Sequence, residues 1–328
     1  MRRTLLSTIL GVAMVATASI PFVEAQSAYP NKPIEFIVPS GAGGGADTSA
    51  RLLANWLTKK KGITVNVVNK TGGGFIIGTN YAMTSAPDGY TMLADSHGFS
   101  TLLAIVSPSL PFDWRKRTWI ARMSEDTPIY LVQANSPWKS LSDVADYAKA
   151  NPGKMRWATA GPSGISTAAI VQYFGKSGIP PANVTSTHVV LKSGAEVVAA
   201  LAGGHIEFAA QQTSEATEMI LSGKIRALAV VSKERLPEIP DVPTVGEAKF
   251  PSLDVVGWHG LSGPLGLPAD VTKFWLDATK EASSDPEFLD TLLKAKKLSA
   301  YLAGKEFESF AEREFEVYQG VFEYMKKK

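Results

Sequence analysis

The sequence of 328 residues contains no cysteine. This absence excludes disulfide bonds, thiolate nucleophiles, cysteine-held metals and a lipid-modified cysteine. Histidine is also scarce, and none of the four is paired at a spacing typical of a metal site; they are His97, His188, His205 and His259. We therefore expect no metal centre.

The sequence also lacks an excess of one charge, since its 33 Lys and Arg residues nearly balance its 31 Asp and Glu residues. It has no long basic run of the kind that binds nucleic acid, so we expect no nucleic-acid partner. After the N-terminal segment, no stretch is long and apolar enough to cross a bilayer. Apolar residues still make up 45% of the chain, which is enough for packed cores.

The first 25 residues have the pattern of a secretory signal peptide (1–25). Two arginines precede an uncharged apolar run at 5–20, and small residues allow cleavage after Ala25 or after Ala28. An uncleaved membrane anchor is the alternative, but the run is shorter than the roughly 20 residues that a span needs. With no cysteine to form disulfides, the expected location is a bacterial periplasm.

Strand patterns alternate with helical patterns in two halves of the chain, which is typical of α/β proteins with parallel sheets. We expect strands at 34–38, 64–68, 90–94, 129–133, 155–158, 188–190, 206–210, 225–231 and 255–262. We expect helices after each Gly-rich loop and at 141–150, 195–202, 269–283, 286–296 and 305–324.

The helical tail at the end of the chain predicts how the two halves are assembled. We expect it to pack back on the first half, which makes domain 1 discontinuous (29–127 plus 255–328) and places domain 2 at 128–254. The chain then crosses twice between the domains, as it does in proteins that close by a hinge around a ligand cleft.

A Gly-rich loop joins a strand to a helix in each half. At such a junction the first N–H groups of the helix have no partner and point out of the sheet edge, and the helix dipole adds partial positive charge. Glycine lets a ligand approach the backbone, so each loop predicts an anion site built from main-chain N–H groups. The candidate ligand-binding residues are Ser40, Gly41, Ala42, Gly43, Gly44 and Asp47 in the first loop, and Gly161, Ser163, Gly164, Ser166 and Thr167 in the second.

The two loops lack residues that two classes of enzyme require. The first loop matches a dinucleotide fingerprint that begins at Gly41, but 48–87 contains no Asp or Glu to hold a ribose. In the second loop, Ser163 lacks the glycine that a hydrolase nucleophile elbow needs, because position 165 is Ile. Both observations disfavour an enzyme.

Five positions, at three places in the chain, lie near the expected cleft. Asp47 either caps its helix or contacts the ligand. Ser96 and His97 end the third strand, at the sheet edge that faces the crevice in this fold class, so we count both as candidate ligand contacts. Trp258 and His259 lie where the chain crosses back, and packing is the favoured interpretation for both.

Several motifs in this order resemble the Bordetella uptake gene (Bug) family of extracytoplasmic solute receptors. They are Tyr29-Pro30-x-Lys32-Pro33-Ile34, the Gly-rich loop ending in Asp47, Ala86-Pro87-Asp88-Gly89-Tyr90, Asn151-Pro152-Gly153-Lys154, Ala160-Gly161-x-x-Gly164, Ser222-Gly223-Lys224-Ile225-Arg226-Ala227-Leu228-Ala229 and Asp241-Val242-Pro243-Thr244.

The resemblance implies a two-domain periplasmic-binding-protein (Venus flytrap) fold with a carboxylate ligand in the cleft between the domains. It implies no enzymatic activity and no metal or organic cofactor. The expected partners are a small-molecule carboxylate, either a di- or tricarboxylate or an aromatic acid, and the membrane permease components of a tripartite tricarboxylate transporter. The protein itself is expected to be a monomer. A periplasmic sensor subunit and, more remotely, a secreted hydrolase are the alternatives.

The chain departs from the family pattern around the expected cleft. Ser40 stands where bulkier residues are common and leaves room for a larger acid, whereas His97 adds a donor for a second carboxylate. Leu191–Gly194, Glu207 and the run Gln211–Ser214 also differ from the usual residues, and we count Gln212 among the candidate ligand contacts. Ligand identity therefore stays open.

Overall fold

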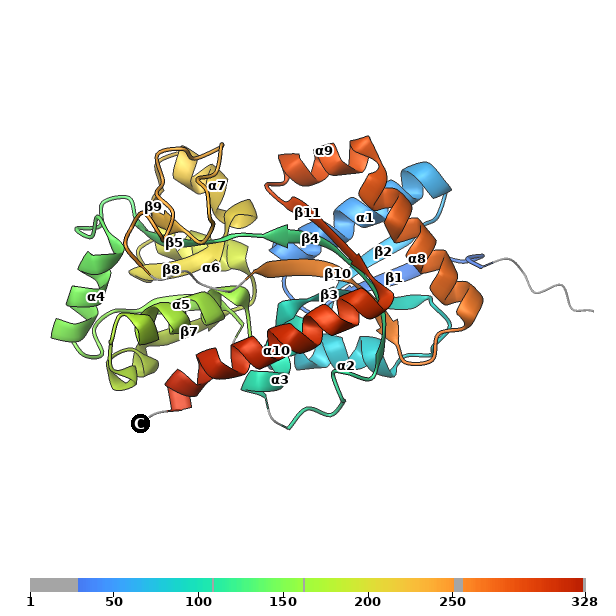
Figure 1. Cartoon of the computed structure of the whole chain (residues 1–328), viewed down its shortest axis with the longest axis horizontal. Helices are drawn as coiled ribbons and strands as arrows, with labels where there is room; N and C mark the ends of the chain where they lie inside the picture. Colours follow the sequence, from blue (N-terminus) through green and yellow to red (C-terminus); the bar gives the residue numbers. More distant parts are fainter. Residues whose placement is uncertain (1–28, 108, 162, 251–255, 327–328) are drawn as a thin grey trace, which may run out of the picture.

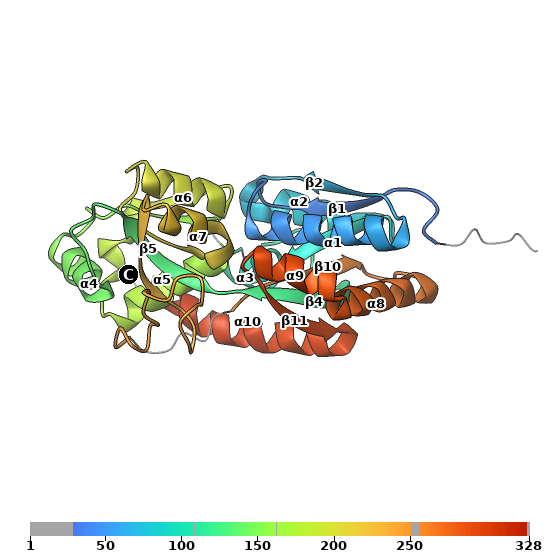
Figure 2. The same cartoon turned by 90° about the horizontal axis from the view of Figure 1, so that it is seen from above.

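The computed structural model describes residues 29–107, 109–161, 163–250 and 256–326. The predicted signal peptide (1–25) and its cleavage sites lie outside these residues. The chain forms two α/β domains that lie side by side (Figures 1 and 2). In the described part of the chain, no helix is long and apolar enough to span a membrane.

Each domain contains one mixed β-sheet. The first sheet has the strand order β11-β4-β10-β3-β1-β2, and the second has the order β7-β6-β8-β5-β9. The strands are β1 (Ile34–Val38), β2 (Val65–Asn69), β3 (Thr91–Ser96), β4 (Arg117–Asp126), β5 (Pro128–Gln133), β6 (Trp157–Ala160), β7 (His188–Leu191), β8 (Phe208–Gln212), β9 (Ile225–Val230), β10 (Gly257–Pro264) and β11 (Leu298–Ala303).

Helices cover the faces of both sheets (Figure 1). They are α1 (Gly45–Lys61), α2 (Ile76–Thr84), α3 (Thr101–Val106), α4 (Leu141–Ala150), α5 (Ile165–Lys176), α6 (Gly194–Ala202), α7 (Thr213–Leu221), α8 (Ala269–Ser284), α9 (Pro286–Lys294) and α10 (Gly304–Lys326), and a short 3₁₀ turn, η2 (His97–Phe99), follows β3.

The predicted α/β class is confirmed, but the expectation of purely parallel sheets is wrong. Strands β1, β2 and β3 are parallel, as are β6, β7 and β8. Strands β4, β10 and β11 run antiparallel in the first sheet, and β5 runs antiparallel to both of its neighbours. These antiparallel strands include the segments that lead from one domain to the other.

Strand β4 was missed from the sequence because both of its ends carry charges. Arg117 and Asp126 are fully buried as side chains, each paired with an opposite charge from a distant segment, Asp95 and Lys297 respectively. Buried charges of this kind are stable only when they are paired. A single sequence shows the charges but not their partners, so no strand was expected at this segment.

Helix α10 joins the two domains. Phe307 belongs to an aromatic cluster of the first domain, whereas Tyr318 and Phe322 pack into the core of the second domain. Figure 1 shows the helix running along both lobes. Only the first part of the tail therefore packs on the first half as expected, and the boundaries 29–127 plus 255–328 and 128–254 stay a prediction.

Asp95 fixes the end of β3, next to the loop that enters the cleft. Its Oδ2 accepts hydrogen bonds from Arg117 Nη1 and from Ser262 Oγ, both at 2.7 Å. Its Oδ1 accepts from Ser100 Oγ at 2.6 Å and from the Ser96 N–H at 2.8 Å. A carboxylate with four donors and a buried guanidinium partner holds β3, β4, β10 and the turn at η2 in one arrangement.

Replacing Asp95 with Ala leaves the buried Arg117 guanidinium without its partner. We expect the free energy of unfolding to fall by about 3–5 kcal/mol, measured by urea denaturation followed by tryptophan fluorescence. Asp277→Ala is the matched control, because it breaks an exposed pair with Lys273 and should cost less than about 1 kcal/mol. Similar small losses in both variants would contradict the role of the Asp95 network.

Candidate functional site

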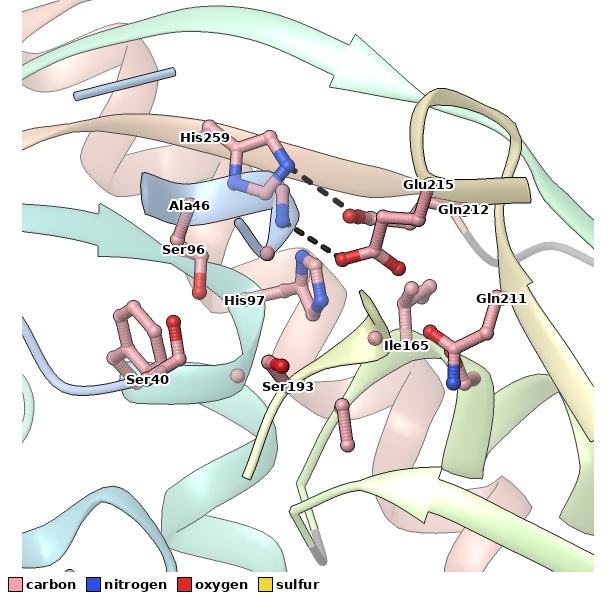
Figure 3. Close-up of a pocket in the computed structure, with 18 of the residues that line it drawn as sticks. Ser40, Ala46, Ser96, His97, Ile165, Ser193, Gln211, Gln212, Glu215 and His259 are labelled. Carbon is pink, nitrogen blue, oxygen red and sulfur yellow. Dashed lines mark hydrogen bonds between the residues drawn. The ribbon is translucent and has the colours of Figure 1, made fainter. Parts of the chain in front are cut away.

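A cavity of about 50 Å³ lies between the two domains (Figure 3). Its first-domain wall comes from the loop before α1, the turn after β3 and the start of β10, and its second-domain wall comes from the starts of α5, α6 and α7. The lining residues are Ser40, Gly44, Gly45, Ala46, Phe75, Ser96, His97, Gly98, Phe99, Ala160, Gly164, Ile165, Ser166, Ser193, Gly194, Gln211, Gln212, Glu215 and His259.

Three helices begin at this cavity. In α1 the first bond within the helix runs from the Thr48 N–H to the Gly44 carbonyl, so the N–H groups before Thr48 have no acceptor in the helix. Helices α5 and α6 begin at Ile165 and Gly194, which also line the cavity. The three helix dipoles make the cavity favourable for an anion.

Polar atoms without a partner lie on both walls. Ser40 Oγ belongs to the first domain and Gln211 Nε2 to the second, and the two side chains are 8% and 1% exposed. Neither atom has a hydrogen-bond partner, although a buried polar atom normally has one. Figure 3 shows both side chains at the cavity, on opposite sides of His97. A ligand with oxygen atoms could satisfy both.

Two buried histidines line the same cavity as neutral rings. Desolvation by burial lowers the pKa of His97 to about 3 and, together with the charge of Lys297, lowers the pKa of His259 well below its usual value. His97 Nδ1 accepts a hydrogen bond from the Trp258 N–H at 3.0 Å. The same nitrogen lies 3.2 Å from the Trp258 carbonyl oxygen, so Nδ1 accepts in one tautomer and donates in the other, and in both the His97 ring at the cavity is neutral.

His259 faces Gln212 across the domain boundary, with 3.3 Å between its Nε2 and Gln212 Nε2. The amide nitrogen donates, so the ring accepts at Nε2 and carries its proton on Nδ1, an atom that has no partner. The packing interpretation of His259 is therefore incomplete, since this ring is also part of the cavity wall.

Phe75 forms another wall that the sequence did not indicate. Its backbone is in the left-handed region, with φ of 82°, which is unusual for a bulky residue and is typical of functional sites. The ring packs against Phe99, with centroids 5.1 Å apart, and reaches Gly161 in the other domain. A Cβ atom at Gly161 would lie 2.1 Å from this ring, so only glycine fits there.

The two domains touch directly around the cavity, so the structure is in a closed form. Ser163 Oγ donates to the Gly98 carbonyl at 2.7 Å, and the Gly41 N–H donates to the Lys192 carbonyl at 3.2 Å. Both hydrogen bonds join a predicted binding loop to the opposite domain, and both must break when the cleft opens.

The structure brings half of the predicted site residues together at the cavity: Ser40, Gly44, Ser96, His97, Gly164, Ser166 and Gln212. The other half lies beside the lining: Gly41, Ala42, Gly43, Asp47, Gly161, Ser163 and Thr167. Their part in ligand binding stays a prediction. In the closed form, Gly41, Gly161 and Ser163 contact the opposite domain, and Thr167 Oγ1 donates to the Gly161 carbonyl at 3.2 Å.

Asp47 shapes the first loop from inside. Its carboxylate accepts from the Gly43 N–H at 3.0 Å, from Asn69 Nδ2 at 2.9 Å and from two nitrogens of Arg51. These hydrogen bonds outweigh desolvation, which acts in the opposite direction, and lower the pKa of Asp47. Asp47 lies in the first turn of α1, whose N-cap is Gly44 without a side-chain cap hydrogen bond, so it is a first-turn acid and not the cap. Direct ligand contact by Asp47 stays a prediction.

The lining residues that were missed from the sequence as ligand contacts include Phe75, Gln211, Glu215 and His259. Gln211 and Glu215 flank a third strand-to-helix junction, from β8 to α7, that has no Gly-rich loop. The signal that could have found them is position alone. Strand β8 is parallel to β6, so this junction opens at the same edge of the second sheet as the loop before α5.

The described chain matches known proteins along most of its length. Residues 49–321 match the model of the tripartite tricarboxylate transporter family receptor (TctC). This chain belongs to that family. Protein BugT of Bordetella pertussis is 31% identical over 269 residues, covering 81% of this chain and 80% of BugT. The family consists of transport receptors, so the chain is a solute-binding protein and not an enzyme.

Two solved structures share this fold to different degrees. MatC from Rhodopseudomonas palustris with bound malate superposes with a TM-score of 0.83 at 25% identity, covering 89% of this chain and 99% of MatC. A TctC solute-binding protein from Polaromonas without ligand gives 0.63 at 26% identity, covering 90% and 99% of the two chains. The chain thus superposes more closely on MatC than on the Polaromonas protein.

The low pKa of His97 predicts a pH-dependent contribution to stability. Between about pH 6.5 and 3 the unfolded chain binds a proton at this ring that the folded chain does not, so stability falls as pH falls. We expect His97→Gln to lose less stability than the wild type between pH 7 and pH 5, by up to about 1.4 kcal/mol per pH unit. Urea denaturation at each pH measures this, with the exposed His205→Gln as control. Equal pH profiles for the wild type and His97→Gln would contradict a neutral buried His97.

Proposed function

We propose that this solute-binding protein captures a small carboxylate in the cleft between its domains and delivers it to the membrane components of a tripartite transporter. The observation that carries the proposal is the pair of buried, unpartnered polar atoms, Ser40 Oγ and Gln211 Nε2, on opposite walls of a cavity where three helices begin. Malate bound to MatC supports the ligand class.

Main-chain donors supply enough binding energy for this role. A hydrogen bond to a charged group contributes about 1.5–3 kcal/mol net, so a few of them reach the roughly −8 kcal/mol of a micromolar complex. The N–H groups of Ala46 and Asp47 in α1 and of Ile165 and Ser166 in α5 are the donors that we assign to the carboxylate. The neutral His97 ring adds a polar group on the first-domain wall.

Opening of the cleft requires a hinge, and we place it where β4 passes into β5. Thr127 is the single residue between these strands, and its carbonyl accepts from the Thr213 N–H at 3.0 Å. Asp126, just before it, accepts from Thr213 Oγ1 at 2.9 Å and from Lys297 Nζ at 3.1 Å. This buried network joins the start of α7, in the second domain, to β4 and Lys297 of the first domain beside the hinge.

The proposal includes export and location. We propose that the signal peptide expected at 1–25 directs the protein to the periplasm, where it acts as a monomer. Its membrane partner is the pair of permease components. Exposed segments of both domains would meet these components only after closure on ligand.

Purified mature protein should be stabilised by its ligand. An acid at 100 times its dissociation constant is expected to raise the free energy of unfolding by about 2.7 kcal/mol. A thermal-shift screen of about a hundred small carboxylates, using protein refolded to remove any bound ligand, measures this as a rise in melting temperature. A screen in which amides shift the protein and no acid does would contradict carboxylate capture.

Gln211→Met removes the unpartnered amide donor and keeps the volume of the side chain. We expect about a tenfold loss of affinity for the acid found in the screen, because one net hydrogen bond is worth about 1 kcal/mol or more. Gln319→Met, on the exposed face of α10, is the matched control and should bind like the wild type. Isothermal titration calorimetry compares the three proteins. Unchanged affinity in Gln211→Met would place the ligand elsewhere.

A further inference from the structure

The cavity contains one charged side chain, and it is an acid. Among the lining residues, Glu215 is the only Asp, Glu, Lys or Arg. It stands in the first turn of α7, and its Oε1 accepts a hydrogen bond from the Gly45 N–H at 2.8 Å across the cleft. Figure 3 shows this carboxylate pointing to the start of α1. Glu215 therefore holds one of the helix N–H groups that a ligand carboxylate would use.

The second oxygen of Glu215 lies at the start of another helix. A Cβ atom added at Gly194, the first residue of α6, would be 1.8 Å from Oε2, so the carboxylate lies against the backbone there. The Glu215 carboxylate is thus seated between the N-termini of α1 and α6. It compensates in part for the positive ends of the helices that surround the cavity.

No neighbouring cation is free to neutralise Glu215. Lys297 is held by Asp126 at 3.1 Å, and both of these side chains are fully buried. The other titratable groups that face the cavity are His97 and His259, which burial keeps neutral. Desolvation, together with the charge of Asp126, raises the pKa of Glu215 to about 7, against the opposing effects of the Gly45 N–H and Lys297.

We propose that Glu215 determines which acids the cleft accepts: it selects a ligand that carries one carboxylate and a hydrogen-bond donor, and it disfavours a second carboxylate. This inference rests on the proposed carboxylate function and adds the charge class of the ligand. The inference is based on the Glu215 carboxylate, which lies against Gly45 and Gly194. The described residues that line the cavity include no Lys or Arg.

The physical reason is competition for the same donors. A ligand carboxylate held by α5 and His97 leaves the rest of the ligand near Glu215. An amide or amine nitrogen at that point donates to Glu215 while Gly45 keeps its hydrogen bond. A second carboxylate at that point is a like charge in a small cavity, so the pair must share a proton, and Glu215 must take it up.

The selection is therefore linked to pH. For a dicarboxylate, binding to the wild type should strengthen by up to about tenfold as pH falls from 8 to 7, because one proton is taken up. It should change less below pH 7, where Glu215 of the free protein, with a pKa of about 7, already carries the proton. For the corresponding monoamide the affinity should change little over this range. Glu215→Gln keeps an oxygen acceptor for the Gly45 N–H but removes the charge, so its dicarboxylate binding should lose this pH dependence.

The test is a matched set of ligands on three proteins. Dicarboxylates of four to six carbons, succinate, glutarate and adipate, are compared with their monoamides by calorimetry at pH 8 and pH 6. The proteins are the wild type, Glu215→Gln and the control Glu218→Gln, an exposed acid on the same helix. At pH 8 the wild type and Glu218→Gln should favour the monoamide by about tenfold or more, and Glu215→Gln should lose or reverse this preference.

Two failures can be told apart. If the monoamide-to-dicarboxylate ratio and its pH dependence are the same in Glu215→Gln as in the wild type, Glu215 does not select the charge of the ligand, and carboxylate capture still stands. If no acid or monoamide of the series binds any of the three proteins at pH 6, the carboxylate function fails, and the inference fails with it.

Discussion

The N–H groups at the first turns of α1, α5 and α6 have no acceptors within their own helices, and the cleft is arranged around these unpaired donors. The three helices belong to two domains, yet they begin at one cavity. In the closed form one of these donors is paired across the domain boundary, because Glu215 accepts a hydrogen bond from the Gly45 N–H. The remaining donors face a space large enough only for a small molecule. An anion that satisfies them from both sides stabilises closure, which is what a receptor needs in order to present a loaded form.

Two buried charge networks hold these helix starts in position. Asp95 and Arg117 fix the end of β3 and the turn that carries His97, and Asp126 and Lys297 fix the strand that crosses between the domains. Neither network reaches the ligand directly. The Asp95 network keeps the first-domain half of the cavity in one arrangement, whereas the Asp126 network lies at the crossing where we place the hinge. Helix α10, which packs on both domains, must adjust its contact with one of them when the cleft opens.

The sequence predicted the fold class and two of the three helix starts because both depend on local patterns. Alternating strand and helix periods gave most elements, including α4 at its observed bounds, and glycines marked the loops before α1 and α5. It did not predict β4 or β11, nor that β5 and β10 run antiparallel to their neighbours. The charged ends of β4 are buried through partners far away in the chain. The role of Gln211, Glu215 and His259 depends on closure of two domains over one another. The spacing of residues along the sequence carries no sign of a contact between domains, so these residues were found only in the folded structure.

The central claim is that main-chain N–H groups from both domains bind the ligand carboxylate. Titration of ¹⁵N-labelled protein with an acid identified as a ligand, followed by NMR of the backbone amides, tests it residue by residue. The account predicts the largest downfield shifts at Ala46 and Asp47 in α1 and at Ile165 and Ser166 in α5, saturating together. Shifts confined to one domain, or largest at residues away from these helix starts, would contradict it.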